Sequence, residues 1–149
     1  MIAGLCVSPG RKKVALYFRL HPDQNINGQR VKEFLRHLAM QVKGPIVLVW
    51  DRFTPHRSRK VRRFLESMGR IHAYFFPAYA PELNPVEGVW GYLKMNPLAN
   101  SAAREVETLS RQAYRYSRGI QRKQQLLTSF IEHTCLPFKM DGHCLCKGQ

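Results

Sequence analysis

Hydrophobic positions along this chain alternate between the spacing of β-strands and the spacing of helices. Residues 1–8 (MIAGLCVS) and 13–20 (KVALYFRL) are β-rich apolar runs on either side of a Pro-Gly turn signal, so they predict a β-hairpin. In residues 27–43 the apolar side chains recur every three or four positions, with basic residues between them. This is the pattern of an amphipathic helix, which Gly44 and Pro45 would end.

The middle of the chain continues this alternation. The run Ile46–Trp50 (IVLVW) is apolar without alternation, which is typical of a strand covered on both faces. A second amphipathic helix follows and ends at Gly69, and residues 71–77 (IHAYFFP) predict another strand. Residues 78–85 (AYAPELNP) predict a loop, and residues 85–94 (PVEGVWGYLK) the start of a further helix.

Beyond residue 100 the pattern is helical. It runs from Ser101 to about Leu136 with an expected break at Gly119, and the last dozen residues show no periodicity. The order of elements predicts an α/β fold, in which a mixed sheet of an antiparallel hairpin plus parallel strands is flanked by helices. We expect one domain over residues 1–100, a helical C-terminal extension of it over 101–136, and a disordered tail over 137–149.

The net positive charge of the chain indicates the kind of molecule that it binds. The chain has 149 residues, enough for one domain with its own core, and its 24 Lys and Arg against 10 Asp and Glu give a net charge of +14. The basic residues are spread over most of the length, which favours a polyanion as partner. A merely solvated basic surface is the alternative, and composition does not distinguish DNA from RNA.

Other compositional features narrow the setting. No apolar run approaches the length of a membrane span, and the first residues lack the layout of a signal peptide, so we expect a soluble intracellular protein with no membrane partner. The cysteines lack the spacing of a zinc ribbon or a disulfide framework, and we interpret them as reduced thiols. The segment GHCLC offers a metal three ligands or is an incidental tail; the cysteines and this histidine are Cys6, Cys135, His143, Cys144 and Cys146.

Two acidic residues stand where chemistry is expected. Asp51 directly follows the apolar strand, and side chains at the carboxyl ends of strands in such sheets are available to ligands. Asn84 is a good N-cap and Pro85 a good first helical residue, which puts Glu87 in the first helical turn. The intervening helix and strand return the chain to the same end of the sheet, so Asp51 and Glu87 are candidates to share a metal.

Asp51 and Glu87 have two possible roles, metal binding or local structure. Carboxylates around Mg²⁺ or a similar cation form the usual site for phosphodiester chemistry, and a basic surface would hold the phosphates. Alternatively, Glu87 reaches back to the amide of Asn84 in a capping box, and Asp51 only starts a turn. We expect Trp90 and Leu93 to fasten the helix of Glu87 to the sheet.

Two segments of the sequence resemble a known family. VLVWDRFTPHRSRKVRRFL, followed by FFPAYAPELNPVEGVWGYLK, is similar to the catalytic domain of bacterial DDE transposases, in the mariner-related insertion-sequence family numbered 630. The second segment is close to that family's Pro-Pro-Tyr-Ser-Pro-Glu-Leu-Asn-Pro-Ile-Glu-x-Val-Trp signature. RLHPDQNINGQRVKEFLRHL fits the preceding part of the domain, so the resemblance extends from Met1 to about Asn100 and more loosely to the helical tail.

The resemblance implies an RNase H-like fold, two divalent cations (Mg²⁺ or Mn²⁺) and a triad of acids. The triad would hydrolyse DNA at transposon ends and join the freed 3′ hydroxyl to a target. Asp51 would be its second acid and Glu87 its third, whereas Glu82 belongs to the signature without binding metal. His56 would orient the site or contact DNA, with a plain surface histidine as the alternative. Asn84 and Pro85 would set the angle of the helix that carries Glu87.

The same resemblance implies that DNA, as transposon ends and target, is the partner. The basic residues expected to contact it surround the two acids in sequence: Arg52, Arg57, Arg59, Lys60, Arg62, Arg63 and Lys94. We expect the protein in the bacterial cytoplasm, associated with the nucleoid.

The match to the family has two gaps. The family's first acid lies upstream of the segment with which this chain begins, and neither Asp23 nor Asp141 is placed to substitute for it. The helix-turn-helix region that precedes the family's catalytic domain is also absent. We therefore expect the chain to be incomplete and inactive alone, as a remnant, a mis-started reading frame, or the downstream half of a split transposase whose partner is an upstream-encoded half or another subunit.

Two other functions compete with this one. A non-catalytic DNA-binding or regulatory fragment would use the same basic residues on phosphates and would poison a complete transposase by mixed assembly. A stand-alone nuclease acting on RNA–DNA hybrids is the third possibility, and the segment PELNPVEGVW counts against it.

Overall fold

The structure is a computed structural model that describes residues 1–95 and 106–136. The chain divides into two compact units, one of Met1–Ile2 with Arg19–Asn84 and one of Ala3–Phe18 with Pro85–Gln149. Each unit is described by itself. The tail predicted for 137–149, which includes His143, Cys144 and Cys146, and the start of the helical extension lie outside the described residues.

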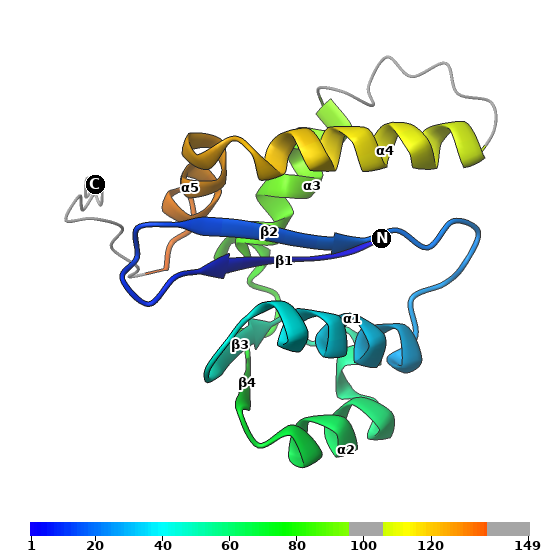
Figure 1. Ribbon diagram of the computed structural model, residues 1–149, viewed down its shortest axis with the longest axis vertical. Coiled ribbons are helices and arrows are strands. Elements are labelled where there is room, and N and C mark those ends of the chain that lie inside the picture. The colour runs from blue at the N-terminus through cyan, green and yellow to red at the C-terminus, as the bar shows by residue number, and fades with distance from the viewer. Residues whose placement is uncertain (96–105, 137–149) are drawn as a thin grey trace. The chain divides into compact units, whose positions relative to one another are not determined.

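The first unit is built on two parallel strands, β3 (Ile46–Trp50) and β4 (Ile71–Phe75). Ile46 is in register with Ile71 and Trp50 with Phe75. Helices α1 (Gly28–Gln41) and α2 (Arg59–Met68) pack against each other in this unit (Figure 1). The buried side chains of the unit come from both helices and both strands: Val31, Phe34, Leu35, Leu38, Ala39, Ile46, Trp50, Val61, Phe64, Ile71 and Phe76.

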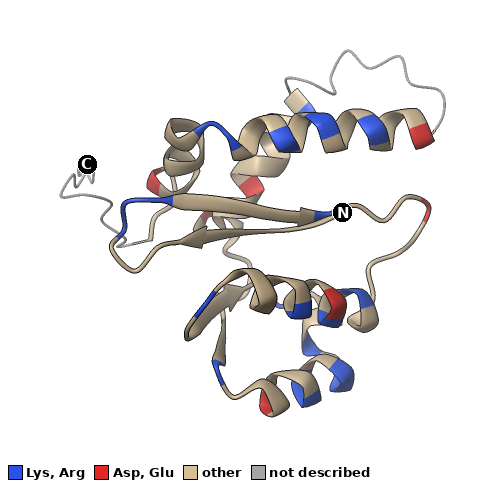
Figure 2. Cartoon of the chain, in the orientation of Figure 1, with Lys and Arg blue, Asp and Glu red and all other residues tan. Residues whose placement is uncertain are grey.

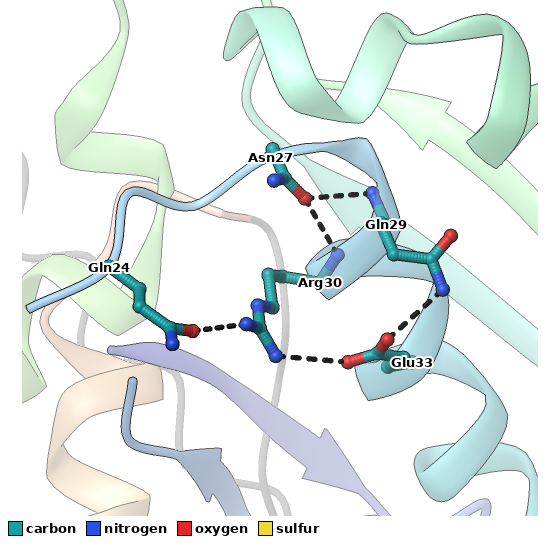
Figure 3. A network of polar contacts seen from close by, with 5 residues as sticks. All are labelled: Gln24, Asn27, Gln29, Arg30 and Glu33. Atoms are coloured by element: carbon teal, nitrogen blue, oxygen red, sulfur yellow. Dashed lines mark hydrogen bonds and ion pairs between the residues drawn. The ribbon is translucent and has the colours of Figure 1, made fainter. Parts of the chain in front are cut away.

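Polar side chains hold the start of α1. Asn27 is its N-cap, and its Oδ1 accepts hydrogen bonds from the amides of Gln29 (3.0 Å) and Arg30 (3.1 Å). The guanidinium of Arg30 also binds the side chains of Gln24 and Glu33 (Figure 3). The capping oxygen satisfies amide groups that have no partner within the helix, so the helix begins where the sequence predicted.

Arg70 holds the other end of α1. Its guanidinium donates to the carbonyl oxygens of Val42 (3.0 Å), Gly44 (2.5 Å) and Ala39. The last carbonyls of a helix lack intrahelical partners, and α1 has no basic residue in its own last turn. Arg70 supplies that missing donor from the turn that leads into β4.

The two strands of the first unit are covered on one face only. Ile46 and Trp50 are each 8% exposed, whereas Val47 is 69% and Val49 45% exposed. On β4, Tyr74 is in register with Val49 and is exposed as well. The prediction of a strand buried on both faces is therefore wrong, because the side chains of β3 alternate between a core face and an open face.

Helix α2 begins after a serine cap and ends where the sequence predicted. Ser58 is the N-cap, with its Oγ accepting a hydrogen bond from the Val61 amide (3.4 Å). Gly69 follows the helix with a φ of 58°, a left-handed conformation that glycine adopts without strain.

The second unit contains a hairpin and three helices. Strands β1 (Ile2–Val7) and β2 (Val14–Arg19) form the predicted antiparallel pair. Helices α3 (Pro85–Met95), α4 (Val106–Gln121) and α5 (Gln124–Glu132) contact one another. The buried side chains shared by these elements are Val14, Leu16, Val89, Leu93, Ser117, Ile120, Leu127 and Ile131.

The junction of α4 and α5 is tied to the backbone of β2. Gln121 donates from Nε2 to the Leu16 carbonyl oxygen (2.7 Å). The amide group of Gln124, oriented to satisfy both partners, donates to the Val14 carbonyl oxygen and accepts from the Val14 amide. Side chains thus bond to the outer edge of β2, which protects an edge strand from unwanted pairing.

The break between the last two helices is not at Gly119. That residue lies inside α4, and the chain leaves the helix only after Gln121. The amides of Arg122 and Lys123 donate to the carbonyl oxygens of Gly119 and Ile120, which closes the last turn. A single glycine within a helix is tolerated when the packing on either side favours the helix, so the predicted break is wrong.

The described residues thus form the predicted mixed α/β fold, with one antiparallel pair, one parallel pair and five α-helices. None of the described helices combines the length and the apolar character that a membrane crossing requires.

Candidate functional site

Asp51 occupies the carboxyl end of β3. The strand pairing continues to its edge, because the Phe76 amide donates to the Trp50 carbonyl oxygen (2.8 Å). The chain then turns, and Asp51 Oδ1 accepts a hydrogen bond from the Phe53 amide (3.0 Å). The same oxygen lies 2.8 Å from His56 Nδ1. Asp51 therefore does start a turn, as the simpler explanation predicted, but it also binds a histidine.

The imidazole of His56 is held in one orientation by two aromatic rings and by two acceptors of Asp51. It stacks on the Trp50 indole, with ring centroids 4.4 Å apart and planes 7° from parallel. Phe53 approaches edge-on, with centroids 5.6 Å apart. Nδ1 also lies 3.3 Å from the Asp51 carbonyl oxygen, so two acceptors face it and this nitrogen is the one that carries a proton. The histidine side chain is 16% exposed and the aspartate side chain 48%.

The geometry of Asp51 suits a hard cation. Oδ1 has two donors, whereas Oδ2 makes no hydrogen bond with any residue that the structure describes. A half-exposed carboxylate oxygen without a protein partner is the kind of donor that Mg²⁺ and Mn²⁺ prefer. The donor chemistry at Asp51 therefore fits the cation that the sequence implied.

Glu87 lies in the first turn of α3 and is exposed. The capping-box alternative does not apply, because the Asn84 amide donates to the Pro81 carbonyl oxygen (2.9 Å) instead. Among the described residues, the Glu87 carboxylate has no hydrogen bond and no ion pair. Helix α3 begins at Pro85, as expected, and the Glu87 carboxylate is available for a ligand.

The helix that carries Glu87 is held by other helices. Val89 and Leu93 are buried, whereas Trp90 is only half-buried. Helix α3 packs on α5 and α4, and the expectation that Trp90 and Leu93 fasten it to the sheet stays a prediction. The contact is close: a Cβ on Gly88 would lie 2.9 Å from Cδ1 of Phe130.

The basic residues expected to bind DNA divide into two groups. Arg52 has a structural contact, because its Nε donates to the Phe76 carbonyl oxygen (3.2 Å) and its guanidinium lies 5.9 Å from the Phe75 ring centroid. The other basic side chains are exposed and have no ion pair with a described carboxylate. They lie before and along α2 and in the last turn of α3: Arg57, Arg59, Lys60, Arg62, Arg63 and Lys94.

The predicted site residues are divided between the two units. Asp51 and His56 are in direct contact in the first unit, while Glu87 belongs to the second. In neither unit do three His, Cys, Asp or Glu side chains of the described residues gather into a metal-binding group. A site shared by Asp51 and Glu87 therefore stays a prediction.

Sequence reasoning missed how His56 is supported. Trp50 was interpreted only as the end of a strand, yet its indole is the surface on which the imidazole lies. No periodic signal announces this stacking. The local spacing W-D-x-x-x-x-H was the only available indication, because a tight turn after a strand returns the fifth residue to the strand end.

Comparison with known proteins adds a family and a fold. The pattern of a protein family described as DDE superfamily endonuclease matches residues 11–110. No curated protein resembles the chain closely enough to count as a match. Among solved structures, the catalytic domain of Mos1 mariner transposase is similar at 18% identity and a TM-score of 0.56, over 85% of this chain and 72% of that one.

Two further structures are similar at the same level. A Mos1 mariner paired end complex with Mn has 18% identity and a TM-score of 0.61, over 81% of this chain and 37% of that chain, so this chain spans little more than a third of it. The Mos1 catalytic domain with Raltegravir and Mg has 18% identity and a TM-score of 0.52, over 87% of this chain and 73% of that one. These likenesses confirm the RNase H-like fold.

Proposed function

Because the chain belongs to the DDE superfamily endonucleases, we propose that it is a transposase catalytic domain in which Asp51 and Glu87 bind Mg²⁺ or Mn²⁺ for DNA cleavage and strand transfer. The single observation that carries this proposal is the free Oδ2 of an Asp51 carboxylate whose other oxygen is held by two donors. The signature around Glu87 supports a finer placement in the mariner-related insertion-sequence family numbered 630.

The residues of this chain prepare the reaction in two ways. Asp51 and Glu87 each present an oxygen ligand, two cations being expected in a complete site. His56 and the Phe53 amide keep the Asp51 carboxylate in one orientation, so that little ordering is left to occur when substrate binds. A bound cation would supply Lewis-acid polarisation of the scissile phosphate and lower the pKa of the attacking water.

The reaction consumes water in its first step. Water attacks the phosphorus of a DNA phosphodiester, the bond to the 3′ oxygen breaks, and a free 3′ hydroxyl and a 5′ phosphate result. In the second step that 3′ hydroxyl attacks a phosphodiester of the target. One phosphodiester bond forms and another breaks, so no oxidant or energy source is required.

A second function rests on the basic residues of α2. These side chains are exposed and carry no ion pair with a described carboxylate, which suits contact with phosphates whether or not cleavage occurs. We assign two of the family's three acids to residues 1–149, so we propose that these residues alone bind DNA without cutting it. A further acid would come from outside residues 1–149, in the same polypeptide, in an upstream-encoded half or in another transposase subunit.

Metal binding tests the site directly. Titration of Mn²⁺, followed by calorimetry or by the electron spin resonance of free Mn²⁺, should show that Asp51→Asn and Glu87→Gln each weaken binding at least tenfold. If the two acids share one site, the affinity lost in the double variant should differ from the product of the two single losses, because interacting residues are not additive. Glu82→Gln is the matched control, since Glu82 is exposed in the same signature.

Two results would contradict the proposal. Unchanged Mn²⁺ affinity in Asp51→Asn or in Glu87→Gln would remove that residue from the site. Robust cutting of terminal-repeat DNA by the 149-residue chain, abolished in Asp51→Ala, would support the site and refute the proposed inactivity of the chain alone.

A further inference from the structure

The arginines of the second unit form a stripe along α4. Arg111, Arg115 and Arg118 lie on the helix and Arg122 directly follows it, with spacings of four, three and four residues. At 100° per residue these positions fall within about 60° of one another, so they share one face. Figure 2 shows basic residues recurring along the length of α4. We call these four residues the α4 stripe.

The face of α4 opposite the stripe is buried in the C-terminal half of the helix, which fixes the direction of the stripe there. Ser117 is 0% and Ile120 2% exposed, and both lie on the far side of the helix from Arg111 and Arg118. Packing of the C-terminal half of α4 therefore turns the stripe outward, whereas Val106 and Leu109 near the start of the helix are exposed.

The charge of the stripe is not neutralised within the described part of the chain. The ion pairs found there are Arg30 with Glu33 and His56 with Asp51, and none involves the stripe. Glu107 shares the face one turn before Arg111, yet Arg111 bonds instead to the hydroxyl of Thr108 (3.5 Å). Like charges four residues apart destabilise a helix, so the stripe costs stability unless a partner neutralises it.

Neutral contacts orient the guanidinium groups without cancelling their charge. Arg118 donates to Gln121 Oε1 (3.1 Å), and the other end of the same amide donates to the Leu16 carbonyl oxygen of β2. Arg115 lies 5.6 Å from the Tyr116 ring centroid. Arg118 is thus tied to the hairpin through one glutamine, which reduces the conformational entropy that binding an anion would cost.

From this arrangement we propose that the α4 stripe binds the phosphate backbone of duplex DNA, in addition to the basic residues of α2. The stripe extends for about 16 Å along the helix axis, and duplex DNA carries a charge every 1.7 Å or so of its own axis, so several phosphates face it. Exposed Tyr114 lies beside the stripe, next to Phe18, and offers a ring to a sugar or base.

A lipid surface is a poorer match for the same residues. Helices that lie on membranes insert an apolar face below the headgroups, whereas the α4 stripe is an exposed face made of arginines. DNA needs only the outward charge. The assignment of DNA as partner rests on the proposed function, whereas the location of the contact rests on the stripe itself.

The salt dependence of DNA binding reports how many phosphates the protein touches. For the full 149-residue chain and a short duplex of arbitrary sequence, the slope of log Kobs against log salt should change by about 0.9 for each phosphate that a variant no longer touches. We expect Arg111→Gln/Arg115→Gln/Arg118→Gln to reduce the slope by about 2 to 3 and to weaken binding over tenfold at low salt. The corresponding triple lysine variant should keep the wild-type slope.

A charge-matched control separates this interaction from a general reduction of positive charge. Lys12→Gln/Lys13→Gln/Lys43→Gln removes three basic side chains elsewhere and should change the slope by less than about 0.9. Far-ultraviolet circular dichroism of each variant checks that the helices remain, since glutamine is a good helix former.

Three outcomes would overturn the proposal. The first is an unchanged salt slope in Arg111→Gln/Arg115→Gln/Arg118→Gln, and the second is an equal loss of affinity in Lys12→Gln/Lys13→Gln/Lys43→Gln. The third is that the triple arginine variant loses binding to phosphatidylserine vesicles while its DNA binding stays intact. Failure of the metal site is distinguishable, because Asp51→Asn and Glu87→Gln should leave the salt slope unchanged. A reduced slope in the stripe variant with normal Mn²⁺ binding in those two would refute the metal site and keep the stripe.

Discussion

His56 Nδ1 lies 2.8 Å from Asp51 Oδ1, and the same imidazole lies flat on the Trp50 indole. The histidine is largely covered and the aspartate is half-exposed, so the contact joins a fixed group to an accessible one. Such a pair restricts the rotation of a carboxylate while leaving its second oxygen free. His56 therefore has the geometry of a positioning residue for Asp51, one of the two roles that the sequence suggested for it.

Removal of the His56 imidazole should weaken metal binding without removing a ligand. We expect His56→Ala to lower the Mn²⁺ affinity of the chain by about tenfold, the lower end of the range for residues that orient metal ligands. His56→Asn should recover part of that affinity, because its amide nitrogen is able to donate to Asp51 Oδ1 from a similar position. Calorimetric titration of Mn²⁺ measures both variants.

The control for this prediction is His37→Ala, at an exposed position on α1. A purely structural role for His56 would lower the stability of both His56 variants equally and give no recovery with asparagine. An affinity of His56→Ala no different from that of the wild type would contradict the positioning role.

Arg70 should be one of the few surface arginines that matter for stability. Its guanidinium donates to three carbonyl oxygens at the end of α1, and Arg70→Met leaves those acceptors without their donor. Partly buried acceptors without partners are costly, so we expect a loss of about 2 kcal/mol in the free energy of unfolding. Urea denaturation measures it. Arg63→Met, at an exposed position on α2, should change the same quantity by less than about 0.5 kcal/mol.

The helices and strands could be predicted from the sequence wherever residues close together in the chain determine them. The strand Ile46–Trp50 and the helix end at Gly69 are where the sequence predicted them, because a short apolar run and a terminal glycine act over a few residues. The contacts of Arg70 could not be predicted, since its acceptors lie 26 to 31 positions earlier in the chain. For the same reason Gly119 was misjudged, as tertiary packing overrode its weak helix propensity.

In the candidate site, too, local features could be predicted from the sequence and contacts that depend on the folded chain could not. Asp51 could be found because a strand end selects it, and the signature pointed to Glu87. The stacking of His56 on Trp50 could not be found, since it depends on the path of a turn. The exposed face of β3 was misjudged, because an apolar run does not reveal which of its side chains a neighbour covers.

His21 should make the protein less stable in mild acid. Burial, followed by the positive charges of Arg30, the N-terminal amine and Arg19, lowers the pKa of His21. Its Nε2 is buried without a hydrogen-bond partner among the described residues. The unfolded chain therefore takes up a proton near pH 6.5 that the native chain accepts only at lower pH, and stability falls as pH drops through this interval.

Removal of the imidazole should remove this effect. As the pH falls from about 7.5 to about 5.5, we expect the urea midpoint of His21→Gln to fall less than that of the wild type. His37→Gln, which changes an exposed histidine on α1, should follow the wild-type curve. Parallel curves for His21→Gln and the wild type would show that the native His21 takes up its proton in the same interval as the unfolded chain.

Two glycines of α3 should respond in opposite directions to the same substitution. A Cβ on Gly88 would lie 2.9 Å from Phe130 Cδ1, and that ring is held in place because it packs against Tyr92 with centroids 6.1 Å apart. Gly91 has nothing within 4 Å of its Cβ position. Alanine at Gly91 should raise the free energy of unfolding by about 0.5–1 kcal/mol through helix propensity alone. Alanine at Gly88 should lower it by about 1 kcal/mol or more, because overpacking outweighs the same gain.

Urea denaturation of both variants decides this, and combination with Phe130→Leu should restore most of the stability that Gly88→Ala removes. If Gly88→Ala proved as stabilising as Gly91→Ala, α3 and α5 would not be packed as closely as the structure shows, and the support for the helix that carries Glu87 would have to come from elsewhere.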